Sequence, residues 1–184
     1  MDTRVHRLFS ASIENRILAA DRLEKSVAHG AAQLVQCLLN NGKIFIVGQG
    51  YAVANSQHFS ETLLHHVELE RPPLPVIALS LDDARKTPVR QIQALGQTED
   101  ILIVLSVSSP SVCIVETIQA AHDKDMPVLA LTCHASKLSS YLSANDSEIC
   151  VPGETDAFIH ETQLFVLECF CDLIEQSLFG QVVE

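Results

Sequence analysis

Short apolar runs alternate with longer amphipathic segments along most of this chain. Five runs have the composition of β-strands: residues 43–48, 75–80, 100–106, 127–132 and 147–152. Four of them are almost wholly apolar, which is typical of strands covered by helices on both faces. Helical composition is found at 52–68, 86–95, 111–124, 136–143 and 156–178.

The N-terminal segment, residues 2–40, is predicted to form two helices. The second is clear, because Leu34, Cys37 and Leu38 recur at helical spacing and the Asn-Asn-Gly at 40–42 stops the helix. Strands that alternate with helices indicate βαβ units, a parallel sheet and right-handed crossovers. No repeat or linker divides the chain, so we expect one α/β domain over residues 1–184.

The composition narrows the class of partner. The chain is 47% hydrophobic and 19% charged, which excludes a disordered protein. Its formal net charge is −11, and its twelve basic residues are scattered along the sequence. A field of this sign repels phosphate backbones, so the sequence argues against direct binding to nucleic acid.

The six cysteines form no CxxC motif and most lie in apolar runs, so they are interpreted as reduced thiols. The N-terminal residues contain no apolar core of a signal peptide. The longest apolar stretch is shorter than the roughly 20 residues of a membrane-spanning helix. We therefore expect a soluble cytoplasmic protein.

Three loops follow the carboxyl ends of predicted strands, where α/β sheets bind ligands. The first contains Gly48 and Gly50, the second runs from Ser106 to Ser111, and the third is residues 132–134. Glycines and serines at helix starts suit an anion such as phosphate. The alternative is structural, since glycine is common in any strand-to-helix turn and serine is a common N-cap.

The chain resembles the SIS (sugar isomerase) domain family. The resemblance is carried by GQGYAVANSQHFS (48–60), ERPPLPVIAL (70–79), ALGQTEDILIVLSVSSPS (94–111), DMPVLALT (125–132) and CDLIEQSLF (171–179). It extends over almost the whole chain and is greatest to the branch of bacterial phosphoheptose isomerases and replication initiator-associating proteins. It implies a flavodoxin-like α/β/α sandwich with a five-stranded sheet, a sugar-phosphate pocket, and a homotetramer joined by the helices of residues 1–40.

The resemblance also implies which residues contact a phosphosugar. They are Gly48, Gly50, Asn55, Ser106, Ser108 and Ser111. The pocket departs from the family pattern, since Val107, Ser109 and Pro110 replace a Thr, a Gly and an Asn, and Ala52 replaces a phosphate-contacting Ser. The segment 80–95 is also shorter than in the isomerases. We therefore expect vestigial or weak binding of a sugar phosphate.

The isomerases of this family use a Glu and a His as an acid–base pair, and several bind zinc. The positions of that pair hold Thr62 and Glu168 in this chain, and a zinc-liganding Gln is replaced by His160. A hydroxyl cannot serve as the base near neutral pH, so we expect no catalytic residue. His58, Glu61, His160 and Glu168 could instead bind zinc, but a vestigial pocket or a hydrogen-bonded cluster between subunits is favoured, and no cofactor is expected.

Three functions remain open on this basis. The first is a non-catalytic protein that binds the replication initiator DnaA and promotes its assembly at the origin, with Leu178 and Phe179 as anchors for the partner. The second is a phosphoheptose isomerase-like enzyme that acts on sedoheptulose 7-phosphate with Glu168 or Glu61 as base. The third is a sugar-phosphate sensor that uses the three matching serines. The sequence analysis favours the first.

Overall fold

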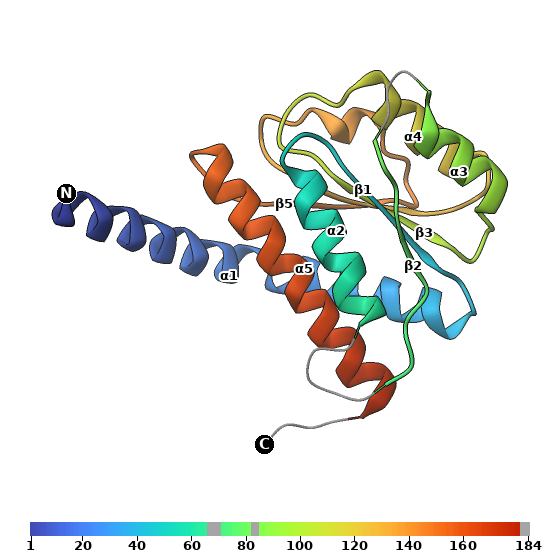
Figure 1. Ribbon diagram of the computed structural model, residues 1–184, viewed down its shortest axis with the longest axis horizontal. Coiled ribbons are helices and arrows are strands. Elements are labelled where there is room, and N and C mark those ends of the chain that lie inside the picture. The colour runs from blue at the N-terminus through green and yellow to red at the C-terminus, as the bar shows by residue number, and fades with distance from the viewer. Residues whose placement is uncertain (66–70, 82–84, 181–184) are drawn as a thin grey trace.

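A computed structural model describes residues 1–65, 71–81 and 85–180, and its centre is one parallel sheet (Figure 1). The strand order is β2-β1-β3-β4-β5. The strands are β1 (Ile44–Gly48), β2 (Val76–Ala78), β3 (Ile101–Leu105), β4 (Val128–Thr132) and β5 (Ser147–Cys150). All four pairings are parallel, which confirms the predicted sheet.

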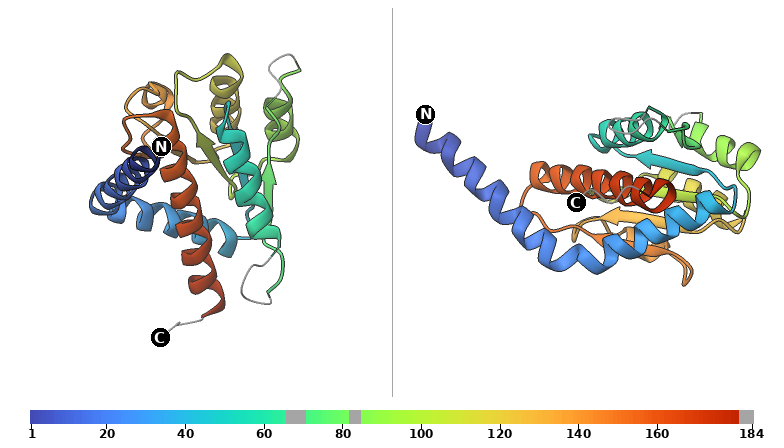
Figure 2. Two further views of the ribbon diagram at one scale, coloured as in Figure 1. Left: turned by 60° about the vertical axis from the view of Figure 1, so that its left-hand side comes forward. Right: turned by 90° about the horizontal axis from the view of Figure 1, so that it is seen from below.

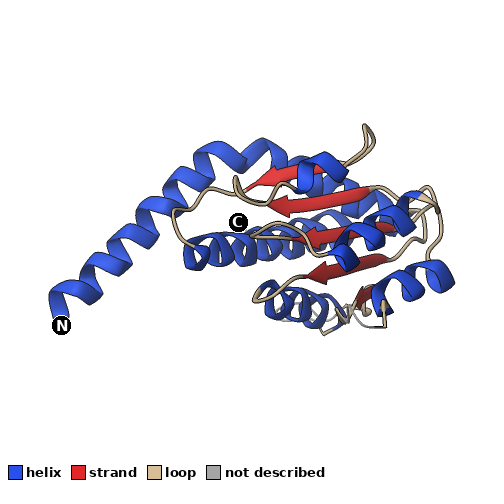
Figure 3. Ribbon diagram, turned by 90° about the horizontal axis from the view of Figure 1, so that it is seen from above, coloured by secondary structure: helices blue, strands red, loops and turns tan. Residues whose placement is uncertain are grey.

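Helices cover both faces of this sheet, so the predicted α/β/α sandwich is confirmed (Figure 3). The helices are α1 (Asp2–Leu39), α2 (Ala52–Leu64), α3 (Thr87–Leu95), α4 (Val112–His122) and α5 (Asp156–Phe179). α1, α2 and α5 pack in one hydrophobic cluster, and α3 and α4 pack in another on the opposite face.

The strands β1, β3 and β4 are apolar because each of them supplies both clusters. Ile44 and Ile46 of β1 face the α1, α2 and α5 side, whereas Phe45 and Val47 face the α3 and α4 side. All four side chains are fully buried. Alternate residues of a strand point to opposite faces, so a sheet with two covered faces requires an unbroken apolar run.

The N-terminal segment differs from the prediction, because residues 2–39 form one helix of 38 residues instead of two. The segment contains no proline, and its one glycine does not interrupt it. A Cβ at Gly30 would lie 3.1 Å from the ring of Phe170. Gly30 therefore serves the close approach of α1 to α5 and is not a helix break.

The first half of α1 extends away from the rest of the chain (Figure 2). Its apolar side chains recur at helical spacing and are 53 to 68% exposed: Val5, Leu8, Phe9, Ile13 and Ile17. We call this set the α1 stripe. The second half of α1 lies on the sheet and buries Ala31, Leu34 and Cys37.

Two other elements are shorter than predicted. Residues 136–143 contain only a 3₁₀ turn, Leu138–Tyr141, and the predicted helix over 52–68 ends at Leu64. Residues 66–68 of that prediction lie outside the described residues. Within the described part of the chain, no helix is long and apolar enough to cross a membrane.

Asp146, in the loop before β5, anchors that edge strand. Its carboxylate is 1% exposed and accepts hydrogen bonds from Val128 N, Ser143 N and His122 Nε2, at 2.8, 2.6 and 2.8 Å. Burial raises the pKa of Asp146, but these hydrogen bonds outweigh it and hold the pKa below its ordinary value. The carboxylate therefore stabilises the folded state above the unfolded pKa of about 3.9, and this stability is lost as the pH falls through the folded pKa.

Replacing Asp146 by Asn is expected to lower the free energy of unfolding by about 2 kcal/mol at pH 7. The difference from wild type should shrink as the pH falls below about 4, because protonation then weakens the wild-type contacts too. Urea unfolding across this pH range measures both effects. Asp21→Asn, on exposed α1 surface, is the control. A difference that does not change with pH would contradict this account of Asp146.

Candidate functional site

Two loops leave the sheet side by side: the loop that contains Gly48 and Gly50, which we call the glycine turn, and the loop from Ser106 to Ser111, which we call the serine loop. β1 pairs with β3 in parallel, and Gly48 lies opposite Leu105. The residues that follow, Gln49 and Ser106, therefore begin their loops at neighbouring points of the carboxyl edge. β1 lies between β2 and β3, so this is the point where the strand order reverses, and α/β sheets bind ligands at such points.

The two glycines of the turn have different roles. A Cβ at Gly48 would lie 2.2 Å from the backbone oxygen of Ala52, so only glycine lets α2 begin this close to β1. Gly50 has a φ of 60°, which is in the left-handed region that favours glycine. The conformation of the backbone is thus sufficient to require glycine at both positions. The turn also brings main-chain atoms close to any ligand bound at the carboxyl edge of the sheet.

The serines of the second loop are hydrogen-bonded within the loop or to α4. Ser106 is fully buried, and its hydroxyl donates to Ser108 O at 2.8 Å. Ser111 is the N-cap of α4, and its hydroxyl accepts from Ile114 N at 3.4 Å. The structural role of Ser111 as a cap is thus confirmed, and Ser108 and Ser109 are the exposed serines of the loop.

Gln49 joins the two loops, a contact that the sequence analysis missed. Its amide oxygen accepts a hydrogen bond from Ser111 N at 2.7 Å. Its amide nitrogen donates to Ser109 O at 3.2 Å and to the Ser108 hydroxyl at 3.4 Å. The only signal in the sequence was the place of Gln49 between two glycines, which did not show where its side chain would point.

His160 lies beside the glycine turn, on the second turn of α5. Its ring packs edge-on against Tyr51, with centroids 5.6 Å apart, and its backbone oxygen accepts from the Asn55 amide at 3.1 Å. Asn55 therefore links α2 to α5. Among the described residues, both ring nitrogens of His160 are buried without a hydrogen-bond partner. Burial lowers the pKa of His160, so the neutral imidazole is favoured.

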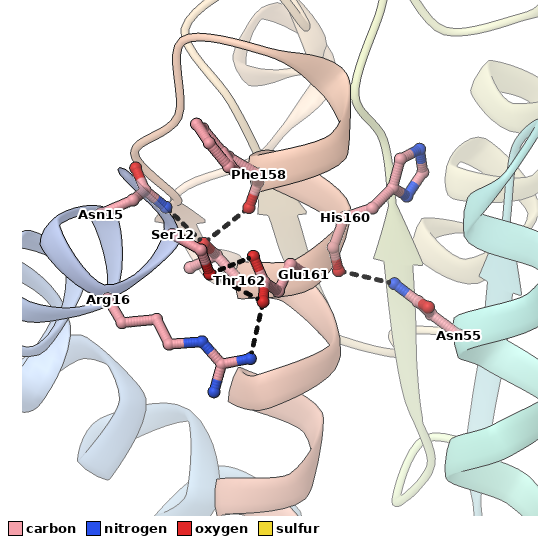
Figure 4. Close-up of polar contacts among 8 residues, drawn as sticks. All are labelled: Ser12, Asn15, Arg16, Asn55, Phe158, His160, Glu161 and Thr162. Atoms are coloured by element: carbon pink, nitrogen blue, oxygen red, sulfur yellow. Dashed lines mark hydrogen bonds and ion pairs between the residues drawn. The ribbon is translucent and has the colours of Figure 1, made fainter. Parts of the chain in front are cut away.

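A polar network on the other side of α5 holds the helix that carries His160 (Figure 4). Glu161 accepts from the Ser12 hydroxyl at 2.8 and 2.9 Å and from the Arg16 guanidinium at 2.8 Å. These groups, Arg16 first, hold the pKa of Glu161 below its ordinary value. Asn15 donates to the Thr162 hydroxyl at 3.0 Å. The partners are about 150 residues apart, so no local pattern predicted them.

The residues at the expected catalytic positions lie on two facing helices. His58 of α2 and Glu168 of α5 form a hydrogen-bonded pair through Nε2 and Oε1, and their side chains are 53% and 43% exposed. The Thr62 hydroxyl donates to His58 O at 3.0 Å, within its own helix. Thr62 thus takes no part in the pair, and a histidine and a carboxylate meet at this place.

The four candidate zinc ligands are not brought together in one copy of the chain. Glu61 pairs with His65 at 3.3 Å, one turn further along α2, and His160 lies at the glycine turn. Only His58 and Glu168 meet. No group of three or more His, Cys, Asp or Glu side chains in the described ranges could hold a metal ion. The arrangement of these four side chains in one chain therefore does not fit a zinc site.

Of the two C-terminal residues expected to anchor a partner, only Phe179 is exposed. Leu178 is partly buried and packs against the core on the α1, α2 and α5 side of the sheet, whereas Phe179 is 38% exposed. Gly180, with a φ of 70°, ends α5 directly after them. Leu178 packs the last turn of α5 instead of projecting as an anchor.

Comparisons with known proteins support one family. The SIS domain model matches residues 9–133. The chain is 40% identical to a phosphoheptose isomerase of Chromohalobacter salexigens over 97% of this chain and 96% of that protein. It superposes on a phosphoheptose isomerase of Francisella tularensis with a TM-score of 0.86 and 35% identity, over 95% and 97% of the two chains.

A third similar protein is the phosphoheptose isomerase of Neisseria gonorrhoeae, with a TM-score of 0.84 and 29% identity over 95% of this chain and 98% of that one. These relatives are named as isomerases and match nearly the full length of this chain. The expectation of a non-catalytic protein that binds the initiator DnaA is therefore wrong as the leading interpretation. It relied on the tail motif and on two substituted positions, whereas the similarity to isomerases spans the whole fold.

Proposed function

This chain belongs to the SIS domain family, and we propose that it binds a phosphorylated sugar of the kind that phosphoheptose isomerases take. The phosphate would lie between the glycine turn and the serine loop. We further propose that residues 1–184 form a single SIS domain. One sheet with helices from both ends of the chain supports this assignment.

The observation that carries the proposal is the meeting of two loops and two helix starts at one point of the sheet. α2 begins at Ala52 and α4 at Val112, directly after the two loops. The N-terminus of a helix attracts anions, and neither helix has an acidic residue in its first turn. The chain as a whole is acidic, with a net charge of −11, but the starts of α2 and α4 are free of acidic side chains. This edge of the sheet is therefore suited to a phosphate.

Isothermal titration with sedoheptulose 7-phosphate tests the binding. We expect saturable binding to wild type and at least a 10²-fold loss of affinity for the unphosphorylated sugar, because charge-assisted hydrogen bonds to phosphate are among the strong ones. Val112→Glu, which places a carboxylate in the first turn of α4, should weaken binding, and Leu95→Glu, at an exposed apolar residue in the last turn of α3, should not. Equal affinity for both sugars would contradict the proposed phosphate site.

A second function, isomerisation of the bound sugar, is favoured by the pair of His58 and Glu168. By resemblance, the family places its acid–base Glu on the helix of Thr62 and its His on the helix of Glu168. This chain retains one histidine and one carboxylate on the same two helices, with their places exchanged. A carboxylate that orients an imidazole is a common arrangement for a general base.

In this mechanism His58 removes the proton from the carbon next to the sugar carbonyl and returns it to the former carbonyl carbon. The carbonyl oxygen takes a proton from water as the enediol forms, and the hydroxyl on the carbon that first lost its proton gives one back to water as the enediol collapses, so that the carbonyl moves by one carbon. Glu168 holds the ring and stabilises the imidazolium that forms. The pair is partly exposed in one chain, so a bound sugar would displace water from it.

We also propose that the chain forms a homotetramer, as the resemblance implies. The α1 stripe is an apolar surface on a helix that extends from the body, and such surfaces mark sites of association. A groove of about 700 Å³ runs along the same helix, between α1 and α5, and includes Leu23, Val27 and Phe165 in its lining. Stripe and groove together are suited to contact with further copies of this chain.

The cytoplasm is the location that we propose. Cys37, Cys133 and Cys171 are buried free thiols. Burial raises the pKa of Cys37 to about 12 and also raises that of Cys171, so both stay protonated and unreactive. Buried reduced thiols are typical of proteins that work in a reducing compartment.

A further inference from the structure

We propose that the side chain of Gln49 occupies the phosphate position in the free protein and must leave it when a sugar phosphate binds. Gln49 would then set the affinity of the site and restrict it to strongly charged phosphate groups. This inference rests on the phosphosugar function proposed above and adds the residue that controls it.

One contact of the Gln49 side chain, at its amide oxygen, is of the kind that a bound anion makes. Its amide oxygen lies 2.7 Å from Ser111 N, the N-cap amide of α4. Helix ends of this kind favour a negatively charged oxygen. The amide nitrogen is bonded to Ser109 O and the Ser108 hydroxyl on the same loop. The side chain therefore covers one amide, Ser111 N, and one hydroxyl, that of Ser108, at the α4 side of the proposed phosphate position.

The backbone of the turn does not require a glutamine here. Gln49 N donates to Leu105 O at 3.3 Å, and Gln49 O accepts from Ala52 N at 3.1 Å. Any residue except proline could make these two bonds. Among the described residues, the hydrogen bonds of the Gln49 side chain all go to the serine loop. What a glutamine adds at this position is an acceptor and a donor aimed at that loop.

A phosphate can replace this side chain, whereas a neutral group cannot. Hydrogen bonds to an ionised acceptor are roughly twice as strong as those between neutral groups, and the helix end attracts a dianion but gains little from an amide. Gln49 is only half buried, so its side chain can rotate into solvent without a change in the backbone. Uncharged sugars would leave it in place.

The contact itself can be tested without a ligand. Hydrogen exchange measured by NMR should be slow at Ser111 N–H in wild type and several-fold faster in Gln49→Ala, which removes its acceptor. Gln57→Ala is the matched control, because Gln57 is an exposed glutamine on α2. Equal exchange at Ser111 in wild type and Gln49→Ala would show that the contact is absent in solution and would overturn the proposal.

Binding is then measured by titration with inorganic phosphate and with sedoheptulose 7-phosphate. Gln49→Ala should raise both affinities by about tenfold, the equivalent of one or two lost internal hydrogen bonds. Gln49→Glu should lower them at least tenfold, because a carboxylate is held more tightly at the helix end and repels phosphate. Gln57→Ala should equal wild type. Weaker binding by Gln49→Ala would make Gln49 a ligand contact and overturn the proposal.

The outcomes separate this inference from the function on which it rests. Binding to wild type that Gln49→Ala leaves equal or weaker would refute the role of Gln49 alone. If none of the four proteins bound either phosphate compound, the proposed function would fail, and the role of Gln49 would fail with it. The graded order Ala, Gln, Glu from strongest to weakest binding would support both.

Discussion

His58→Gln is expected to lower the rate of sedoheptulose 7-phosphate isomerisation by about 10²- to 10⁴-fold, the usual contribution of a positioned general base. Glutamine retains polarity and a similar size but cannot take up a proton. The loss should appear in kcat, with the affinity for the sugar phosphate nearly unchanged, because the phosphate would lie at the glycine turn and not at His58. Steady-state kinetics and titration of the same variant measure the two effects.

His65→Gln is the matched control for this prediction. His65 lies at the end of the same helix, pairs with Glu61 as His58 pairs with Glu168, and is 77% exposed. It should leave the rate unchanged, whereas Glu168→Gln should lower it because the imidazole loses the carboxylate that orients it. A wild-type protein that binds the sugar phosphate but shows no turnover would refute the isomerase function and leave the binding function standing.

Leu8→Asp combined with Ile13→Asp is expected to weaken self-association by about 10³-fold. Each residue belongs to the α1 stripe and is 57% exposed in the single chain. An apolar anchor at the centre of an interface contributes on the order of 2 kcal/mol, and two of them correspond to that fold-change. A buried carboxylate without a partner adds a further cost.

Light scattering and sedimentation at micromolar concentration measure the assembly. Wild type should have about four times the chain mass of 20.1 kDa, and the double variant should be smaller. Thr3→Asp with Arg7→Asp, on the same helix but outside the stripe, should keep the wild-type mass. Circular dichroism checks that the helix content is retained. A monomeric wild type, or a double variant that stays tetrameric, would show that the stripe has another role.

The site was predictable only in part. The glycine turn and the serine loop follow apolar strands, so their place at the carboxyl edge could be derived from the order of elements. The role of each side chain could not. Asn55 bonds to α5, Ser106 turns inward and Gln49 crosses to the neighbouring loop. A side chain's direction depends on neighbours that are distant in the sequence, which one sequence does not place.

The expectation of no catalytic residue rests on two single positions, because Thr62 and Glu168 are each compared with one position of the family. In the structure, Glu168 meets His58 across two helices, so a histidine and a carboxylate remain together. The two are 110 residues apart, and their meeting depends on the packing of α2 against α5. A comparison of single positions cannot predict a pair whose two side chains come from different helices.

The sequence by itself determined the parallel sheet and its covered faces, since burial on both sides imposes apolar runs whose length and order are read directly from the chain. It also determined the two loops at the carboxyl edge. The tertiary structure alone decided that residues 2–39 form one helix, because Gly30 acquires its meaning only where Phe170 packs on it. It alone decided that Gln49 covers Ser111 N and that His58 meets Glu168. The pattern of apolar residues in a segment indicates which of its faces are buried. The partners of a polar side chain depend instead on how elements that are distant in the sequence pack together.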